Sequence, residues 1–346
     1  MIGLWDTTGA EVVKALSAER RSAGGVTSGL ALTLIAVVDE KRVREAEAAA
    51  TIAAAAHPCR LLIVVRSDVT REVNRLDAEI VVGGRLGPCE AVVMRMYGRL
   101  ALHAESVVMP LLAPDVPVVA WWHEEPPEHI AYDFLGVVAD RRVTDSAQAV
   151  DPVTALRQRA ADYAPGDTDL AWTRITPWRT LVAGAFDTLE ARVTGATVVA
   201  PEHDPTAALM RGWLAARLRI TPKAEGTTQY PRMRAVELTC ENGDVLRLTR
   251  EDGTATFSRT GQVERQLPLA RRPLGDELAE ELRRLDADQI YAEALGALAG
   301  IGGLEERSPN RVHIWKDPAV SERPDAPATS LPDGAGAEPG GALETP

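Results

Sequence analysis

Cysteine is scarce in this sequence. Its 346 residues include three, Cys59, Cys89 and Cys240, which lie far apart, in or beside apolar runs. So few and so widely spaced thiols do not make a disulfide framework, and they are typical of proteins from a reducing compartment. We expect buried, inert thiols. A redox switch is the alternative, and it would require a thiol whose pKa is lowered by its surroundings.

Positive charge and long apolar runs are also lacking. The 38 Lys and Arg residues are outnumbered by 50 Asp and Glu residues, which gives a formal net charge of -12. Such a chain repels phosphate backbones and anionic lipid, so we expect neither nucleic acid nor a membrane as its partner. No apolar run approaches the ~20 residues of a membrane span. The opening MIGLWDTTGAEV has no basic region followed by an apolar core, so we expect no secretion signal and a cytoplasmic protein.

The common catalytic and nucleotide-binding motifs are missing. The first strand-to-helix turn, residues 37–42, reads VVDEKR and has an acidic residue where a G-x-G-x-x-G turn would hold phosphate. Gly83, Gly84 and Gly87 are the nearest substitute, but their spacing does not match and favours a plain turn. No P-loop, G-x-S-x-G or H-E-x-x-H motif occurs. The sequence therefore offers no complete catalytic constellation and predicts no cofactor.

Apolar, β-branched runs alternate with helical patterns in the first part of the chain. Residues 30–38 and 59–65 read as strands around an Ala/Glu/Arg helix, which is one βαβ unit with a parallel strand pair. Further strands are expected at residues 80–82, 90–97, 116–122 and near 143, with a helix over 100–112. This order predicts an α/β domain over residues 1–150, with a mostly parallel sheet flanked by helices.

The second half predicts a smaller α+β domain. Residues 151–192 read as a helical connector in which two helices meet at Pro177. Residues 193–316 begin with a strand and a helix over 205–218. The pairs Asn242–Gly243 and Asp252–Gly253 then predict the hairpins of an antiparallel meander. A helix over 274–298, broken near Asp286, follows. Residues 317–346 are rich in Pro, Gly, Ala and Glu and are expected to be disordered.

Two stretches concentrate aromatic side chains. In residues 113–128, APDVPVVAWWHEEPPE, an apolar strand ends in Trp121 and Trp122. Because successive side chains of a strand point to opposite faces, we expect one indole in the core and the other on the opposite face or at the mouth of a pocket. The loop that follows contains possible metal ligands, although a solvated acidic loop is the simpler interpretation. These are His123, Glu124, Glu125, Glu128 and His129.

The second aromatic stretch lies in residues 167–187. Trp172 and Trp178 recur there at helical spacing, beside Arg174 and Arg179. Trp and Arg are the residue types that most often anchor protein interfaces, so this segment is a candidate partner-binding surface. The alternative is that both indoles fill the core between the two domains.

Several stretches together resemble a known family. They are HPCRLLIVV (57–65), LDAEI (76–80), ESVVMPLLAPDVPVVAWW (105–122), YAPGDTDLAWTRITPWR (163–179) and LRRLDADQIYAEAL (282–295). They resemble the actinobacterial glucose-6-phosphate dehydrogenase assembly protein family, OpcA. The resemblance implies a cytosolic, non-catalytic partner that assists assembly of the dehydrogenase of the oxidative pentose phosphate pathway or raises its activity. Cyanobacterial relatives are linked to thiol control, but we match none of their cysteines to the three found here, so this property is not carried over.

Three functional hypotheses follow. The first is an assembly factor or allosteric activator of glucose-6-phosphate dehydrogenase. Its partner contacts, or the frame beneath them, would be Trp121, Trp122, Trp172, Arg174, Trp178 and Arg179. The second is an α/β sensor or enzyme that itself binds a sugar phosphate or nucleotide at the sheet end near residues 122–128 and the glycines of 83–87. The third is a metal-dependent hydrolase that uses the loop of residues 123–129.

Overall fold

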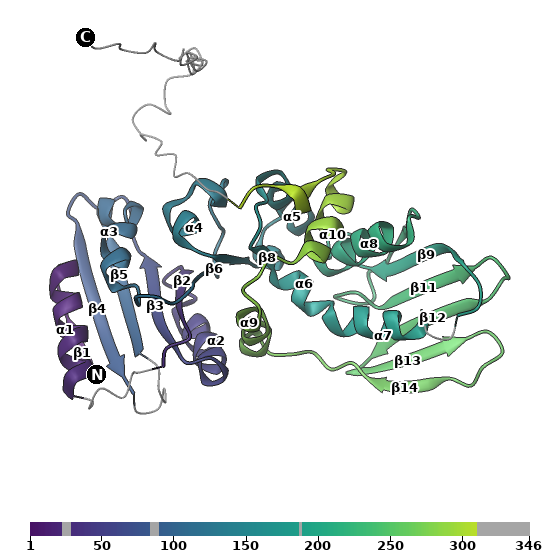
Figure 1. Cartoon of the computed structure of the whole chain (residues 1–346), viewed down its shortest axis with the longest axis horizontal. Coiled ribbons are helices and arrows are strands. Elements are labelled where there is room, and N and C mark those ends of the chain that lie inside the picture. Colours follow the sequence, from purple (N-terminus) through teal and green to yellow (C-terminus); the bar gives the residue numbers. More distant parts are fainter. Residues whose placement is uncertain (23–28, 84–89, 187–188, 310–346) are drawn as a thin grey trace, which may run out of the picture. The chain divides into compact units, whose positions relative to one another are not determined.

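A computed structural model describes residues 1–22, 29–83, 90–186 and 189–309 (Figure 1). Two β-sheets form there, each with its own helices. Gly84, Gly87, Cys89 and the predicted disordered tail of residues 317–346 lie outside the described residues.

The first sheet has eight strands in the order β1-β4-β5-β3-β2-β6-β7-β8. The strands are β1 (Ile2–Leu4), β2 (Leu32–Val38), β3 (Cys59–Arg66), β4 (Arg75–Val82), β5 (Glu90–Tyr97), β6 (Val118–Trp122), β7 (Arg141–Thr144) and β8 (Asp167–Asp169). All neighbours from β5 to β8 pair in parallel, whereas β4 runs antiparallel to both β5 and β1. The prediction of a mostly parallel sheet is confirmed.

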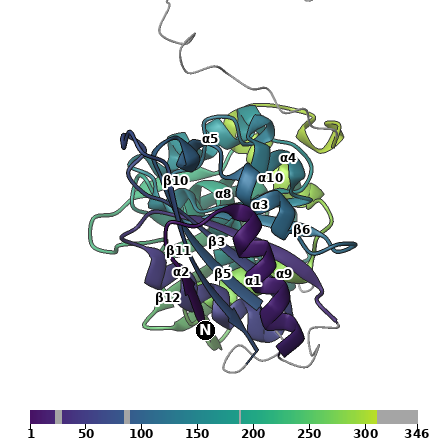
Figure 2. The same ribbon diagram turned by 90° about the vertical axis from the view of Figure 1, so that its left-hand side faces the viewer.

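Helices cover both faces of this sheet. On one face, α1 (Gly9–Ser22) and the short α3 (Glu105–Val108) bury Val12, Leu16 and Val108 against the strands, and Figure 2 shows α1 lying across them. On the other face, the alanine-rich α2 (Val43–Ala56) and α9 (Leu274–Arg283) form a second core. Burial on both faces explains why β2, β3 and β6 read as continuous apolar runs.

Two details of the first half differ from expectation. The strand predicted at residues 80–82 is the eight-residue β4, because its charged side chains are paired: Arg75 with Asp77, and Glu79 with Arg95 of β5. The helix predicted over residues 100–112 is instead three short turns around α3, namely η2 (Gly98–Leu102), α3 itself and η3 (Met109–Leu111). Pro110 has no N–H to donate, so a continuous helix would lose a hydrogen bond there.

The second sheet has six strands in the order β10-β9-β11-β12-β13-β14. They are β9 (Val193–Ala200), β10 (Lys223–Gly226), β11 (Ala235–Cys240), β12 (Val245–Glu251), β13 (Thr254–Arg259) and β14 (Arg265–Pro268). Strands β11 to β13 form the predicted antiparallel meander, and β14 extends it by a strand that was not predicted. Strand β10 pairs in parallel with β9 after a crossover through α8 (Pro205–Leu218). At the second predicted hairpin, Asp252 and Gly253 both have positive φ, as a type I′ turn requires.

The helices of the second half confirm the predicted breaks. They are α5 (Pro152–Asp162), α6 (Leu170–Arg174), α7 (Thr176–Phe186), α8 (Pro205–Leu218) and α10 (Gln289–Ala299), and α4 (Phe134–Val138) precedes them. Helix α7 begins next to Pro177, which fits the first turn because the N–H that proline lacks has no partner there. Asp288 caps α10 after the break that follows α9.

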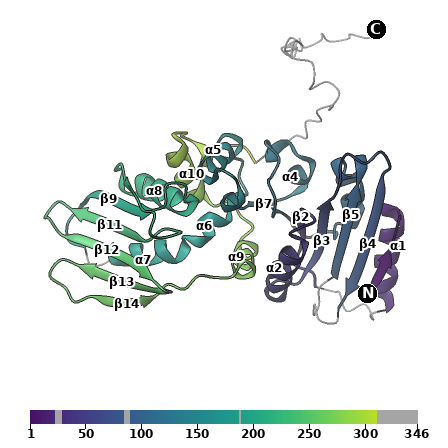
Figure 3. The same cartoon turned by 180° about the vertical axis from the view of Figure 1, so that it is seen from behind.

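The chain crosses between the two sheets more than once. Strand β8, from the predicted connector, pairs with β7 and extends the first sheet, and α9 follows β14 in the chain but packs against α2 (Figure 3). Elements beyond residue 150 therefore complete the first sheet and its core. The domain boundaries at residues 150 and 193 remain predictions.

Candidate functional site

The tryptophan pair at the end of β6 lies entirely inside the protein. Trp121 and Trp122 point to opposite faces, as expected, but both indoles are 0% exposed. Trp122 joins the core under α1, and Trp121 joins the core under α2 and α9. Of the two alternatives expected for the second indole, the structure shows the opposite face and not the mouth of a pocket, because β6 is an inner strand whose two faces are both covered. The pair can support a contact surface from beneath but cannot touch a partner.

The metal ligands predicted in the loop after β6 do not lie together in the structure. His123 is buried, and its ring lies 4.8 Å from that of Trp121 and 3.3 Å from the Glu45 carboxylate of α2. His129 faces Asp162 of α5 at 3.7 Å instead. In the part of the chain that the structure describes, no group of three or more His, Cys, Asp or Glu side chains could hold a metal ion. The hydrolase hypothesis thus has no assembled ligand set among these residues.

Residues 163–179 connect the first sheet to the second half of the chain. Asp169 ends β8, is fully buried and caps α6 by accepting a hydrogen bond from the Ala171 N–H. It also accepts bonds from the Thr144 hydroxyl at 2.7 Å and the Ser146 N–H at 2.9 Å. Burial raises the pKa of the Asp169 carboxyl, and the nearby charge of Asp145 adds to the effect. One side chain therefore fixes the end of β7, β8 and α6 together.

Buried ion pairs extend this connection to α9. Arg174 binds both oxygens of Asp145, at 2.6 and 2.8 Å, and a Glu277 oxygen at 2.9 Å. Arg141 of β7 pairs with Glu281, which also accepts a hydrogen bond from Thr173. We call this set the joint: Arg141, Asp145, Thr173, Arg174, Glu277 and Glu281. Burial alone would lower the pKa of Arg174, but the bonds to Asp145 and the charge of Glu277 outweigh it and raise the pKa.

The remaining predicted site residues lie close to the joint. Trp172 is buried and donates from Nε1 to Asp288 at 2.9 Å, while Trp178 is buried in the core of the second half. The Arg179 guanidinium lies 3.5 Å from the centroid of the Trp172 ring, and its Nη2 donates to the Thr176 hydroxyl. Burial lowers the pKa of Arg179 to about 10. The stacking agrees with a cation–π contact.

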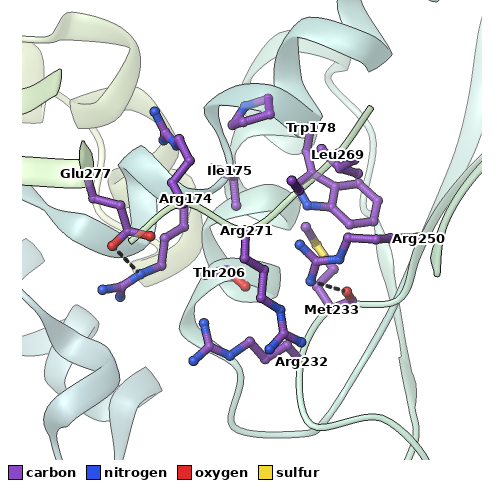
Figure 4. A pocket seen from close by; sticks show the side chains of 13 residues that line it. Arg174, Ile175, Trp178, Thr206, Arg232, Met233, Arg250, Leu269, Arg271 and Glu277 are labelled. Atoms are coloured by element: carbon purple, nitrogen blue, oxygen red, sulfur yellow. Dashed lines mark hydrogen bonds and ion pairs between the residues drawn. The ribbon is translucent and has the colours of Figure 1, made fainter. Parts of the chain in front are cut away.

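An arginine-lined pocket beside Trp178 was not anticipated from the sequence (Figure 4). Its volume is about 180 Å³. It is lined by Arg174, Ile175, Pro177, Trp178, Thr206, Arg232, Met233, Arg250, Leu269, Ala270, Arg271, Arg272 and Glu277. The arginines come from separate segments that only the fold brings together. The local density of Arg in residues 231–234 and 270–272 was the one available signal.

The two cysteines in the described residues are buried, whereas redox-sensing thiols are accessible to solvent. Cys59 lies in β3 and Cys240 at the end of β11, and both are buried. Burial raises the pKa of the Cys240 thiol, with the charge of Asp244 acting in the same direction. A raised pKa disfavours the reactive thiolate, so Cys240 fits the expected inert thiol.

No helix within the described ranges has the length and apolar character needed to cross a membrane.

Two family models match the chain. Residues 50–161 match the model described as the glucose-6-phosphate dehydrogenase subunit N-terminal domain, and residues 165–295 match the corresponding C-terminal domain. The boundary between the matches falls just before the segment that forms β8 and α6.

Curated cyanobacterial proteins are similar over part of their length. A "Putative OxPP cycle protein OpcA" of Synechococcus elongatus is 29% identical over 265 residues, which cover 61% of this chain and 59% of that protein. A protein of the same name from Synechocystis is 30% identical over 143 residues, covering 39% of this chain and 30% of that protein. The matched region thus spans less than two thirds of each relative.

Among solved structures, the 3-ketoreductase KijD10 of Actinomadura kijaniata is similar at 10% identity and a TM-score of 0.45, covering 78% of this chain and 94% of that chain. A likeness at this level does not bear on function. The two family matches and the cyanobacterial relatives agree with each other and with the stretches singled out in the sequence, and the chain belongs to the OpcA family.

Proposed function

We propose that this chain assembles with glucose-6-phosphate dehydrogenase in the cytoplasm and raises its activity, without catalysing a reaction itself. The observation that carries the proposal is the match of both halves of the chain to domains described as belonging to a subunit of that dehydrogenase. In support, the buried charged groups of the joint are engaged with one another, including Arg174 and Glu277, which pair where they line a pocket. That arrangement suits a rigid binding frame.

The predicted contact residues take two different roles in this proposal. The four indoles are buried, and Arg174 is held by two carboxylates, so these residues form the frame beneath the contact surface. They are Trp121, Trp122, Trp172, Trp178 and Arg174. Arg179 is the direct contact, since its side chain is partly exposed and has no ion pair among the described residues.

Arg179 is suited to receive a carboxylate from the dehydrogenase. Its guanidinium carbon lies over the Trp172 ring, and this contact reduces the conformational entropy lost on binding. Its Nε atom is buried and finds no hydrogen-bond acceptor within the described part of the chain, so a partner's carboxylate would have to bind at the terminal nitrogens. Burial lowers the pKa of Arg179, and the charges of Asp288, Glu280 and Glu281 offset only part of this effect, so an incoming carboxylate would further favour the charged form. A charged partner at this position would bind more strongly than at a fully solvated arginine.

The proposal is tested by mixing the purified chain with purified glucose-6-phosphate dehydrogenase. We expect a complex by size-exclusion chromatography with light scattering, and a higher kcat or a lower KM in steady-state kinetics. Absence of a complex at micromolar concentrations, together with unchanged kinetics, would contradict it. Turnover of a metabolite by the chain alone would contradict its non-catalytic part.

The role of Arg179 is tested by Arg179→Gln. We expect the affinity for the dehydrogenase to fall at least about tenfold, since loss of an interface arginine commonly costs more than ~1 kcal/mol. Arg265→Gln is the matched control, because Arg265 is an exposed arginine on β14 that is not assigned to the contact surface. Equal affinity of both variants and the unaltered chain would show that the contact lies elsewhere. Circular dichroism and thermal unfolding check that each variant is folded.

A further inference from the structure

The arginine-lined pocket concentrates positive charge in a chain whose formal net charge is -12. Five of its lining residues are arginines, and the only carboxylate among them, Glu277, is bonded to Arg174. Two of the five arginines already have partners within the protein. Arg174 belongs to the joint, and Arg272 binds Glu280 and the Thr173 carbonyl.

The other three arginines form few hydrogen bonds and no ion pairs with the described residues. Arg250 donates to the Met233 carbonyl at 3.2 Å and lies 5.2 Å from the Trp178 ring centroid. Arg232 and Arg271 are exposed, and their side chains form no hydrogen bond or ion pair with any described residue. Figure 4 shows these side chains reaching the pocket from different segments of the chain.

Their charges act on one another. Burial lowers the pKa of Arg250, and the positive charges of Arg271 and Arg232 lower it further. Solvent screens part of the repulsion at the exposed Arg232 and Arg271, and an anion held between the three guanidinium groups would offset what remains. Guanidinium groups also match phosphate oxygens in geometry, since each can donate two parallel hydrogen bonds.

A second hollow adjoins the pocket and shares these three arginines. Its volume is about 740 Å³, and Tyr230, Glu251 and Asp252 are among its other lining residues. Glu251 is paired with Arg234, and neither it nor Asp252 forms an ion pair with the three shared arginines. The small pocket can accept one phosphoryl group, and the larger hollow has room for the organic part of a ligand.

We propose that Arg232, Arg250 and Arg271 form a binding site for a small phosphorylated molecule, which they hold by its phosphoryl group. Arg174 and Trp178 line the same pocket, so an occupied site would touch both the joint and the core beneath α7. The site belongs to this chain alone and does not depend on the proposed dehydrogenase partner.

The test is isothermal titration calorimetry of the full chain with inorganic phosphate at constant ionic strength, the balance being sodium chloride. Parallel titrations use glucose 6-phosphate, glucose and a glutamate-rich peptide. We expect saturable binding of phosphate and of glucose 6-phosphate, and none of glucose. Arg232→Gln and Arg271→Gln should each weaken binding at least about tenfold, whereas Arg265→Gln should leave it unchanged. Thermal unfolding without ligand verifies that the variants are folded.

Several results would overturn the proposal. One is the lack of saturable phosphate binding; another is equal affinity in the two pocket variants and the control. Binding of phosphate with exclusion of glucose 6-phosphate would limit the site to a free anion. Binding of the acidic peptide but not of phosphate would identify the pocket as a docking point for an acidic protein segment. The dehydrogenase is absent from these measurements, so their outcome is independent of the proposed assembly function.

Discussion

At the scale of the residue, two helical glycines occupy opposite environments. Gly212 lies inside α8, and a Cβ added there would be 2.2 Å from the Ala294 carbonyl oxygen of α10. Gly184 lies in α7 with nothing within 4 Å of the same added atom. The first glycine is needed for close helix packing. The second only weakens its helix, because glycine loses more backbone freedom on folding than alanine.

This contrast predicts opposite effects of the same substitution. Gly212→Ala should lower the free energy of unfolding by about 1–3 kcal/mol, because α8 and α10 must move apart. Gly184→Ala should raise it by about 0.5–1 kcal/mol through better helix propensity. Urea denaturation followed by circular dichroism measures both. Similar shifts in the two variants would mean that α8 and α10 do not pack as closely as described.

The tryptophans illustrate what could be predicted residue by residue. Alternation along β6 correctly assigned Trp121 and Trp122 to opposite faces of the sheet. The sequence could not tell which element covers Trp121, because α9, which packs over that face, comes about 150 residues later in the chain. The pocket arginines were missed for the same reason, since their proximity depends on contacts between distant segments.

At the scale of the element, the joint holds β7, α6 and α9 together through side chains that are nearly excluded from water. Arg141 and Glu281 are 4% and 6% exposed in their side chains, and Glu281 also receives the Thr173 hydroxyl hydrogen bond. The neighbouring Glu280 pairs with Arg272 in a more exposed position. Two adjacent glutamates of one helix thus make ion pairs of very different burial.

Replacing each glutamate in turn should show how much the buried and the more exposed ion pair contribute to stability. Glu281→Ala should cost about 3–5 kcal/mol of stability, because it leaves the buried Arg141 without its counter-charge. Glu280→Ala should cost less than about 1 kcal/mol, as is usual for a pair in contact with solvent. Chemical denaturation provides the values. If Glu281→Ala lost as little stability as Glu280→Ala, water would have to reach Arg141, and the joint would not be excluded from solvent.

Elements with strong periodicity or turn chemistry were predicted well, and short polar ones were not. The helix over residues 205–218 and the break near Pro177 agree with α8 and the start of α7. Strands β10 and β8 were missed because Lys223–Gly226 is exposed throughout and Asp167–Asp169 consists of polar residues. Such edge strands form through pairing with a neighbour, which leaves no hydrophobic pattern to detect.

At the scale of the whole molecule, the first sheet depends on a late segment of the chain. Helix α9 supplies Leu278 and Leu282 to the core formed by α2 and the strands. The fold class could be predicted because each half has its own pattern of strands and helices. The packing of α9 on the first sheet could not be predicted, because no local sequence pattern in α9 indicates which sheet it covers.

Truncation should expose this dependence. A chain ending at Arg271 lacks α9 and α10, so we expect it to bind a hydrophobic dye and to aggregate, with a much lower unfolding temperature. A chain ending at Lys316 retains both helices and loses only residues predicted to be disordered, so its unfolding temperature should stay within about 2 °C of the full chain. A soluble, cooperatively folding product of the shorter truncation would refute the dependence on α9.

The late arrival of α9 also has a consequence during synthesis on the ribosome. Helix α2 emerges early, but the helix that shields it is translated only after the whole second sheet. At roughly 5–20 residues per second, the nascent chain would present an uncovered alanine-rich surface for on the order of tens of seconds. Nascent-chain chaperones would encounter the first sheet in that interval, and cellular yield should be sensitive to their supply.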